Sequence, residues 1–270
     1  MKMPELSVIV VSFNTCGLTL RCIENFYDEA VAAGWEVVVV DNGSADGTAL
    51  AVAGRFPAVR LVRAEKNLGY AGGCNLGLRA ARGTVLILLN GDVLARAEVL
   101  RALARTLREN PDIGALAPGL RTTAGGPQPF AFGRDPTLGY LLRRGWRAVR
   151  RKGPLHDWGV TRPVEVDWVS GACLATRRDV VERVGLLDER FFLYFEDNDW
   201  CLRIRRAGFR VIYDPRWQVT HLGGASQPDR RAVHRVYRES LLAFYAKHYG
   251  PAATAVLRLL LPIYDRLLGR

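Results

Sequence analysis

The stretch LSVIVVSFN, residues 6–14, sets a short apolar run directly before polar side chains. Similar runs follow at residues 36–40, 59–62 and 85–89. Each run is rich in Val, Ile and Leu and alternates little with polar residues, which is typical of strands buried on both faces. Because residues 6–14 lack a cleavage site, we interpret them as a strand and not as a signal peptide. The pattern predicts a parallel sheet.

Segments of helical period separate these runs. One apolar stripe extends from Leu20 to Val31, and a second from Leu100 to Leu107. Alternating strands and helices predict an α/β fold with a doubly wound, mostly parallel sheet flanked by helices. Ligands of such sheets bind at the carboxyl ends of the strands, so the residues that follow each strand are the first candidates for function.

Polar side chains collect at those carboxyl ends. Ser12 and Asn14 follow the first strand, Asp41 ends the second, and Asn90 and Asp92 follow the fourth. A turn alone would also favour these residue types. Cations that bridge diphosphates need oxygen ligands, usually one or two carboxylates completed by phosphates and water. We therefore expect a nucleotide and cation site at this edge.

The segment KNLGYAGGCNLGL, residues 66–78, carries glycines at the start of a predicted helix. Glycines allow the backbone to approach a phosphate closely, and a helix N-terminus favours negative charge. The segment matches neither the dinucleotide fingerprint nor the P-loop. We take Asn67, Gly69 and Asn75 as candidate residues for binding the phosphates of a nucleotide.

The segment FFLYFEDNDWCLRIRR, residues 191–206, holds the candidate base. In a helix that starts near Phe195, Asp197 lies on one stripe with Cys201 and Ile204, whereas Asp199 pairs with Arg203. Asp197 is therefore expected to face inward, where desolvation raises its pKa. Glu196 and Asp199 fit the ordinary pattern of acids at a helix start.

The pattern changes after residue 117 and again after residue 165. Residues 117–162 are rich in Gly, Pro and Arg, and strand-like runs resume at 166–169 and 172–176. A helix is expected at 178–184, strands at 210–213 and 218–221, and helices from residue 230 onward. We divide the chain into a nucleotide-sugar-binding half (1–117), an insertion or basic lid (118–165), an acceptor-binding and catalytic half (166–229) and C-terminal helices (230–270).

The formal net charge of +11 points to an anionic partner. Lysine and arginine gather between Arg143 and Lys152, and the segment from Leu141 to Lys152 also carries the apolar residues Leu142, Trp146 and Val149. Such a helix would rest on an anionic bilayer or form a basic lid over the donor phosphates, and the sequence leaves both open. The five scattered cysteines and the lack of a membrane-length apolar run favour a cytoplasmic location, free or at the inner face of the membrane.

Six segments in order, SVIVVSFN, VVVVDNGSADGT, KNLGYAGGCNLG, LILLNGD, residues 169–210 and THLGGAS, together resemble the rhamnosyltransferase-like family 2 of inverting glycosyltransferases with the GT-A fold. The resemblance implies that Asp41 contacts the base or ribose, that Asp92 binds the metal, and that Asp197 is the general base. It also implies that Glu196 shapes the acceptor site and that His221 is a further metal ligand. The chain departs from many members at Asn90, where they carry Asp.

The sequence thus predicts an enzyme that moves rhamnose or a similar hexose from a nucleoside-diphosphate-sugar to a hydroxyl of a glycan or lipid-linked acceptor, with Mg²⁺ or Mn²⁺ as cofactor. Two other functions are considered. A nucleotidyltransferase would show a glycine-rich basic signature after the first strand, where this chain has SFNTCG. A basic nucleic-acid-binding module would fit the charge, but we expect no nucleic-acid partner.

Overall fold

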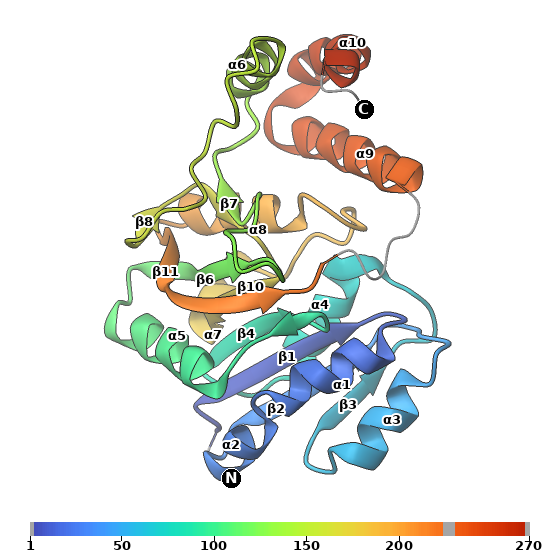
Figure 1. The fold of residues 1–270 in the computed structure, drawn as a ribbon, viewed down its shortest axis with the longest axis vertical. Coiled ribbons are helices and arrows are strands. Elements are labelled where there is room, and N and C mark those ends of the chain that lie inside the picture. Colours follow the sequence, from blue (N-terminus) through green and yellow to red (C-terminus); the bar gives the residue numbers. More distant parts are fainter. Residues whose placement is uncertain (1–2, 224–229, 268–270) are drawn as a thin grey trace.

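The computed structural model describes residues 3–223 and 230–267. Figure 1 shows one large twisted sheet with helices packed around it and a helical layer at one end. The strand order is β3-β2-β1-β4-β10-β6-β11-β5, and β8 pairs with β11 outside this path. The expected α/β class, with a sheet flanked by helices, is confirmed.

The N-terminal half builds the parallel part of the sheet. Its elements are β1 (Leu6–Ser12), α1 (Cys16–Glu24), α2 (Tyr27–Ala32), β2 (Glu36–Asp41), α3 (Thr48–Arg55), β3 (Arg60–Arg63), α4 (Gly69–Ala80) and β4 (Val85–Asn90). β1 pairs in parallel with β2 and β4, and β2 with β3. β1, β2 and β4 are buried almost throughout, as the lack of alternation predicts.

Two local expectations in this half are wrong. The predicted stripe from Leu20 to Val31 belongs to two helices, because the chain turns at Asn25 and places Phe26 in the core. Val31 is exposed. The third strand, β3, is only partly buried, since it lies at the edge of the sheet and has a neighbouring strand on one side only.

The C-terminal half adds antiparallel pairing. Its elements are β5 (Val93–Leu94), α5 (Ala97–Glu109), β6 (Ile113–Arg121), β7 (Phe132–Gly133), β8 (Val164–Glu165), β9 (Trp168–Val169), β10 (Cys173–Arg177), α7 (Arg178–Val184), α8 (Glu196–Arg206) and β11 (Arg210–His221). β10 runs antiparallel between β4 and β6, whereas β6 and β11 are parallel. The parallel prediction therefore holds for the N-terminal strands, and the remainder of the sheet is mixed.

The structure differs from the sequence expectation at two strands of this half. β6 continues to Arg121, past residue 117, although Gly119 and Pro118 made this region look irregular. β11 is one long strand and not two, because the irregularity between Asp214 and Gln218 shifts its register against β6 without ending the strand.

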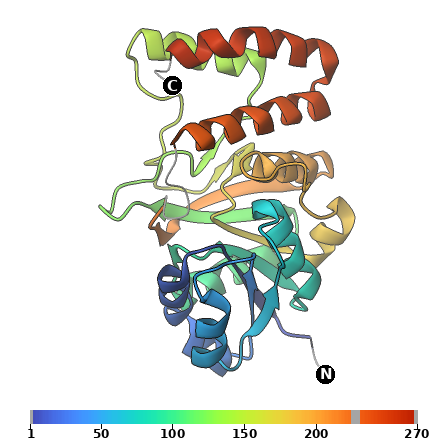
Figure 2. The ribbon, with the colours of Figure 1, turned by 90° about the vertical axis from the view of Figure 1, so that its right-hand side faces the viewer.

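A helical layer covers one end of the molecule. It consists of α6 (Leu138–Val149), α9 (Arg230–His248) and α10 (Gly250–Leu267), and both views show it on the side away from the N-terminal strands (Figures 1 and 2). A second apolar cluster joins this layer to α8 through Leu141, Phe195, Leu202, Phe244 and Leu257. The layer therefore supports the helix that begins with the predicted base. Among the described residues, no helix is both long and apolar enough to span a bilayer.

Candidate active site

The loops that follow β1 and β2 are joined at the carboxyl edge of the sheet. The Asn14 N–H donates to Ser44 Oγ at 3.0 Å, and Asn14 Oδ1 accepts the N–H of Ala45 at 2.8 Å. Asp41 is nearly buried and its Oδ1 accepts the Ser44 N–H at 3.0 Å. Asn14 has a φ of 50°, a conformation that asparagine adopts more readily than most residues. Asn14, in the loop after β1, and Asp41, at the end of β2, are therefore held close to each other.

The loop that follows β3 closes the next position along this edge. Asn42 Nδ2 donates to Asn67 Oδ1 at 3.1 Å and to the Gly69 carbonyl at 2.9 Å. Gly43 has φ 82°, and a Cβ built there would lie 2.5 Å from the Lys66 carbonyl carbon. Only glycine fits at position 43, so the two loops pack backbone to backbone. Asn67 and Gly69 thus lie beside Asn42.

Ser12 and Asn75 have partners inside the protein. Ser12 Oγ lies 2.7 Å from Thr19 Oγ1 and 3.1 Å from Thr15 Oγ1 in a buried hydroxyl cluster. Asn75 Nδ2 donates to the Leu187 carbonyl and to Glu189, while Asn75 Oδ1 accepts the Leu187 N–H. Both amide hydrogens of Asn75 are used in fixing the segment before α8. We therefore assign these side chains a supporting role and leave them out of the proposed donor contacts.

Asp92 and His221 meet because β5 and β11 pair. His221 lies opposite Val93 in that antiparallel pair, and His221 Nε2 lies 3.2 Å from Asp92 Oδ1. On the other side of the ring, Nδ1 lies within 3.0 Å of the Gln128 amide. An amide can donate to Nδ1 or accept from it, so Gln128 can hold the ring in the tautomer whose Nε2 is free to bind a cation.

The chemistry of this pair fits a cation that also binds a diphosphate. Asn90 Oδ1 is buried and has no hydrogen-bond partner among the residues that the structure describes, so it is an oxygen acceptor two residues from Asp92. Among the described residues, no cluster of three or more His, Cys, Asp or Glu side chains is arranged to hold a metal ion. Asp92, His221 and Asn90 would therefore supply part of a coordination shell that phosphates and water complete.

Asp197 lies in the first turn of α8, and this helix begins directly after two strained residues. Tyr194 and Phe195 have φ values of 66° and 68°, which are uncommon for aromatic residues and cost free energy. Asp197 Oδ2 accepts the Gly171 N–H at 3.1 Å, and Oδ1 accepts the Asn198 N–H at 2.8 Å. Burial raises the pKa of Asp197 to about 6, against the lowering effect of these hydrogen bonds.

The two acids beside Asp197 are more buried than expected from the sequence. Glu196 is 4% exposed, Asp199 is 0% exposed, and Asp197 is intermediate. Within the described part of the chain, Glu196 Oε2 has no hydrogen-bond partner, and burial raises the pKa of Glu196 well above its usual range. Glu196 and Asp199 do lie in the first turn of α8, as expected, but neither is solvated: α9 covers Asp199, and Glu196 lies close to Tyr70 and Cys74 of α4.

Asp199 joins α8 to α9 through a buried ion cluster. The pair with Arg203, expected from the sequence, has its Nε 2.8 Å from Asp199 Oδ2. Asp199 Oδ1 also lies 2.5 Å from Lys247 Nζ and 2.7 Å from His248 Nε2. These contacts fix the helix that begins at Glu196 against the helical layer.

Replacing Asp199 with alanine should destabilise the fold by about 3 kcal/mol, because buried cations then lose their carboxylate partner. Urea unfolding of the two proteins measures the difference. Asp179→Ala is the matched control, since that acid also pairs with an arginine, Arg177, but its side chain is 65% exposed. The control should lose less than about 1 kcal/mol. Equal losses in the two variants would contradict a structural role for the buried cluster.

Short contacts connect the sheet edge that carries Asn67 and Gly69 to the candidate base, Asp197. Tyr70, which follows Gly69, donates its N–H to the Phe192 carbonyl at 2.7 Å and its hydroxyl to the Gly171 carbonyl at 2.6 Å. The Gly171 N–H in turn binds Asp197. At the next residue, the Ala172 carbonyl accepts the Asn90 N–H at 3.0 Å. Residues 171–172 therefore lie between the candidate base and the candidate cation ligands.

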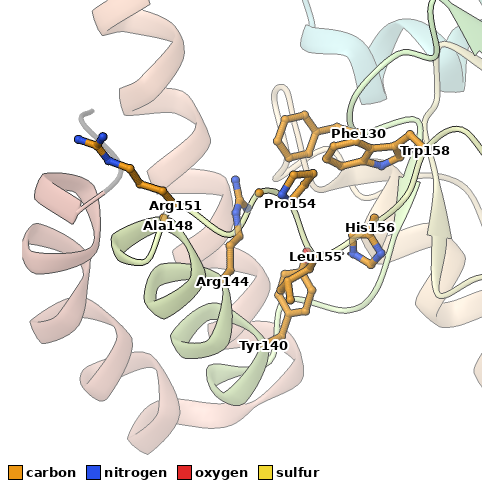
Figure 3. Close-up of a pocket in the computed structure, with 10 residues that line it drawn as sticks. Phe130, Tyr140, Arg144, Ala148, Arg151, Pro154, Leu155, His156 and Trp158 are labelled. Atoms are coloured by element: carbon orange, nitrogen blue, oxygen red, sulfur yellow. Dashed lines mark hydrogen bonds between the residues drawn. The ribbon is translucent and has the colours of Figure 1, made fainter.

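An open pocket of about 380 Å³ lies beside α6. Figure 3 shows aromatic rings of Phe130, Trp158, Tyr140 and His156 around it, with Arg144 reaching over from α6. The Phe130 and Trp158 ring centroids are 5.1 Å apart, and the Arg144 guanidinium is 5.3 Å from the Phe130 ring. Phe130 is two residues from Gln128, so the pocket is close in sequence to the partner of His221.

Sequence reasoning missed the residues that orient the candidate groups. Gln128 lies in the region interpreted as an irregular insertion, and its contact with His221 joins positions 93 residues apart. Tyr70 likewise touches Gly171 across 101 residues. No local pattern signals such contacts, because they depend on how the strands are ordered in the sheet.

Comparisons with known proteins identify the family of the chain. The model of the family described as glycosyl transferase family 2 matches residues 7–154. An N-acetylglucosaminyl-diphospho-decaprenol L-rhamnosyltransferase of Mycobacterium tuberculosis is 34% identical over an alignment of 236 residues, and this alignment covers 79% of this chain and 76% of that protein. A low-salt glycan biosynthesis hexosyltransferase of Haloferax volcanii is 28% identical and covers 90% of this chain and 76% of its own.

Solved structures show the same fold. A mannosyltransferase from Pyrobaculum calidifontis, in complex with GDP-Man and Mn²⁺, superposes with a TM-score of 0.56 at 21% identity, covering 100% of this chain and 84% of that one. GalNAc-T7 with UDP, GalNAc and Mn²⁺ gives a TM-score of 0.59 at 18% identity, covering 91% of this chain and 50% of that one. At these sequence identities, the similarity shows a shared fold and nothing more specific.

Proposed function

We propose that this chain, which belongs to glycosyl transferase family 2, transfers rhamnose or a similar hexose from a nucleoside diphosphate to a hydroxyl of a lipid-linked glycan, with inversion. It is a glycosyltransferase with the GT-A fold. The specific reaction is our proposal. The observation that carries it is Asp197, a carboxylate of raised pKa held by backbone N–H groups near the candidate cation ligands.

Asp197 is the proposed general base. A base must be within reach of the acceptor hydroxyl and must hold its proton more tightly than an ordinary aspartate to be effective near neutral pH. The raised pKa of Asp197 supplies the second property, and its partial exposure supports the first. Glu196, whose pKa is raised by burial and by the neighbouring Asp197, would shape the acceptor side.

The donor diphosphate is proposed to lie along the edge formed by Asp41, Asn67, Gly69 and Asn90, with Asp92 and His221 as cation ligands. A bound Mg²⁺ or Mn²⁺ would stabilise the charge that develops on the leaving diphosphate. Asn14 and Asp41 would contact the base or ribose, since their loops adjoin. The Mn²⁺ in the solved relatives supports this choice of cofactor.

The aromatic pocket beside α6 is the proposed acceptor subsite. Its rings offer apolar faces for a sugar or a prenyl chain, and Arg144 adds a cation that suits the diphosphate of a lipid-linked acceptor. The relative from Mycobacterium tuberculosis is named for such an acceptor, an N-acetylglucosaminyl-diphospho-decaprenol.

A transfer assay tests the proposal. The purified chain is incubated with Mn²⁺, an N-acetylglucosaminyl-diphospho-prenol and each of the dTDP-, UDP- and GDP-linked forms of rhamnose. We expect a product one deoxyhexose heavier, with an anomeric configuration opposite to that of the donor. Exposed Phe130 is replaced with alanine in a parallel arm, which should raise the KM for the lipid-linked acceptor more than it lowers kcat. Retention of configuration, or no transfer to this acceptor from any of the three donors, would contradict the proposed reaction.

A further inference from the structure

Helix α6 carries an exposed apolar stripe next to cations. Leu142, Trp146 and Val149 are spaced i, i+4 and i+7 and are 58%, 50% and 56% exposed. Arg143 and Arg150 are exposed beside this stripe, and residues 138–152 contain no acid. This exposed area sits next to the face that Leu141 buries in the second apolar cluster.

Helix α10 adds a second apolar stripe in the same layer. Val256, Leu259 and Ile263 are 44%, 77% and 56% exposed and follow a helical repeat on the side opposite Leu257 and Leu261, which are buried. Leu141 of α6 belongs to the same buried cluster as these leucines. Both views show α6 and α10 side by side at the end of the molecule (Figures 1 and 2). We refer to these two exposed stripes, on neighbouring helices of one layer, as the outer surface.

The charges on this outer surface are positive. Arg258 and Arg266 are exposed on α10, in addition to the arginines of α6. The Arg150 guanidinium lies 4.3 Å from the Trp146 ring centroid, and Lys152 Nζ lies 5.5 Å from it. Apolar side chains, a tryptophan and flanking cations together match the boundary between acyl chains and anionic headgroups.

We propose that this outer surface of α6 and α10 docks on an anionic lipid bilayer. The apolar side chains of both helices insert at the headgroup boundary, and the arginines contact lipid phosphates. A second copy of the chain would place like charges against each other, so charge complementarity favours the bilayer as occupant. The proposal does not depend on the reaction proposed above, because docking is measured without substrate. It also favours a membrane role for the basic segment over a lid role.

Vesicle co-sedimentation tests the docking. Wild-type protein should pellet with vesicles in which about a third of the lipid is phosphatidylglycerol, and much less with pure phosphatidylcholine. Arg143→Gln with Arg150→Gln should weaken partitioning about 25-fold, from about fivefold for each cation. Leu142→Ser, Trp146→Ser and Leu259→Ser together should weaken it by more than about tenfold.

The matched control carries Leu50→Ser and Arg105→Gln on α3 and α5, away from the helical layer; Leu50 is 80% exposed and the Arg105 side chain 67%. It should pellet like the wild type. Circular dichroism and light scattering of every variant establish folding and size. The proposal is overturned if the surface variants and the control pellet equally, if neutral vesicles bind as well as anionic ones, or if the wild type is a dimer that the surface variants dissociate.

Discussion

Replacing Asp197 with asparagine should lower the transfer rate by about 10²- to 10⁴-fold while donor binding stays close to that of the wild type. The amide keeps one acceptor for the Gly171 N–H but cannot take a proton from the acceptor hydroxyl. Single-turnover kinetics measure the chemical step, and calorimetry with nucleoside diphosphate and Mn²⁺ measures donor binding. A variant with wild-type turnover would remove Asp197 as the base.

The pH dependence of the wild type gives an independent test of the same residue. Because burial raises the pKa of Asp197 to about 6, the base loses activity as pH falls through that value and is fully active above it. The raised pKa also means that the charged carboxylate costs stability above about pH 6 and that this cost vanishes below about pH 4. Asp197→Asn should therefore be at least as stable as the wild type at neutral pH.

Glu196→Gln is the matched control for both measurements. Glu196 is buried, and burial raises its pKa and disfavours the charged form, so a neutral amide of the same shape suits this position. We expect a loss of about tenfold or less, without the acid limb of the pH profile being removed. A loss equal to that of Asp197→Asn would mean that the two carboxyls act as one titrating pair.

The parallel half of the fold could be predicted because its information is local. Runs such as residues 6–11 and 85–89 show burial on both faces directly, and the residues after them mark the edge of the sheet. β6 could not be predicted this way, since Pro118 and Gly119 resemble loop residues until the neighbouring strands are known. The order of β10, β6 and β11 is a property of tertiary packing and leaves no local signal.

The candidate site was predictable in its residue types more than in its contacts. Asp92 and His221 were chosen for their chemistry, and the β5–β11 pairing then places them 3.2 Å apart. Asn75 illustrates the opposite case. It lies in a glycine-rich helix start that resembles a phosphate site, yet its amide is used by Leu187 and Glu189. A side chain's partners depend on the segment packed against it, which a single motif does not contain.

Removing the carboxylate of Asp92 should abolish tight binding of Mn²⁺ and nucleoside diphosphate together and reduce transfer by at least about a thousandfold. Asp92 is the only carboxylate in the proposed ligand set, because His221 would bind the cation through an imidazole nitrogen and Asn90 through an amide oxygen. One protein carboxylate suffices when the diphosphate brings its own oxygens, so the cation should bind poorly without the donor. The proposed metal dependence therefore rests mainly on this residue.

Calorimetry of Mn²⁺ with and without nucleoside diphosphate compares the wild type with Asp92→Asn, His221→Ala and Asn90→Asp. We expect Asp92→Asn to lose donor-dependent Mn²⁺ binding and His221→Ala to weaken it by about ten- to a hundredfold. Asn90→Asp should tighten Mn²⁺ binding in the absence of donor, since a second carboxylate joins the site and Asn90 Oδ1 has no partner to lose. If chelation leaves transfer unchanged, or if Asp92→Asn binds Mn²⁺ and donor like the wild type, the leaving diphosphate must be stabilised by basic side chains, and Asp92 and His221 would then form a structural pair.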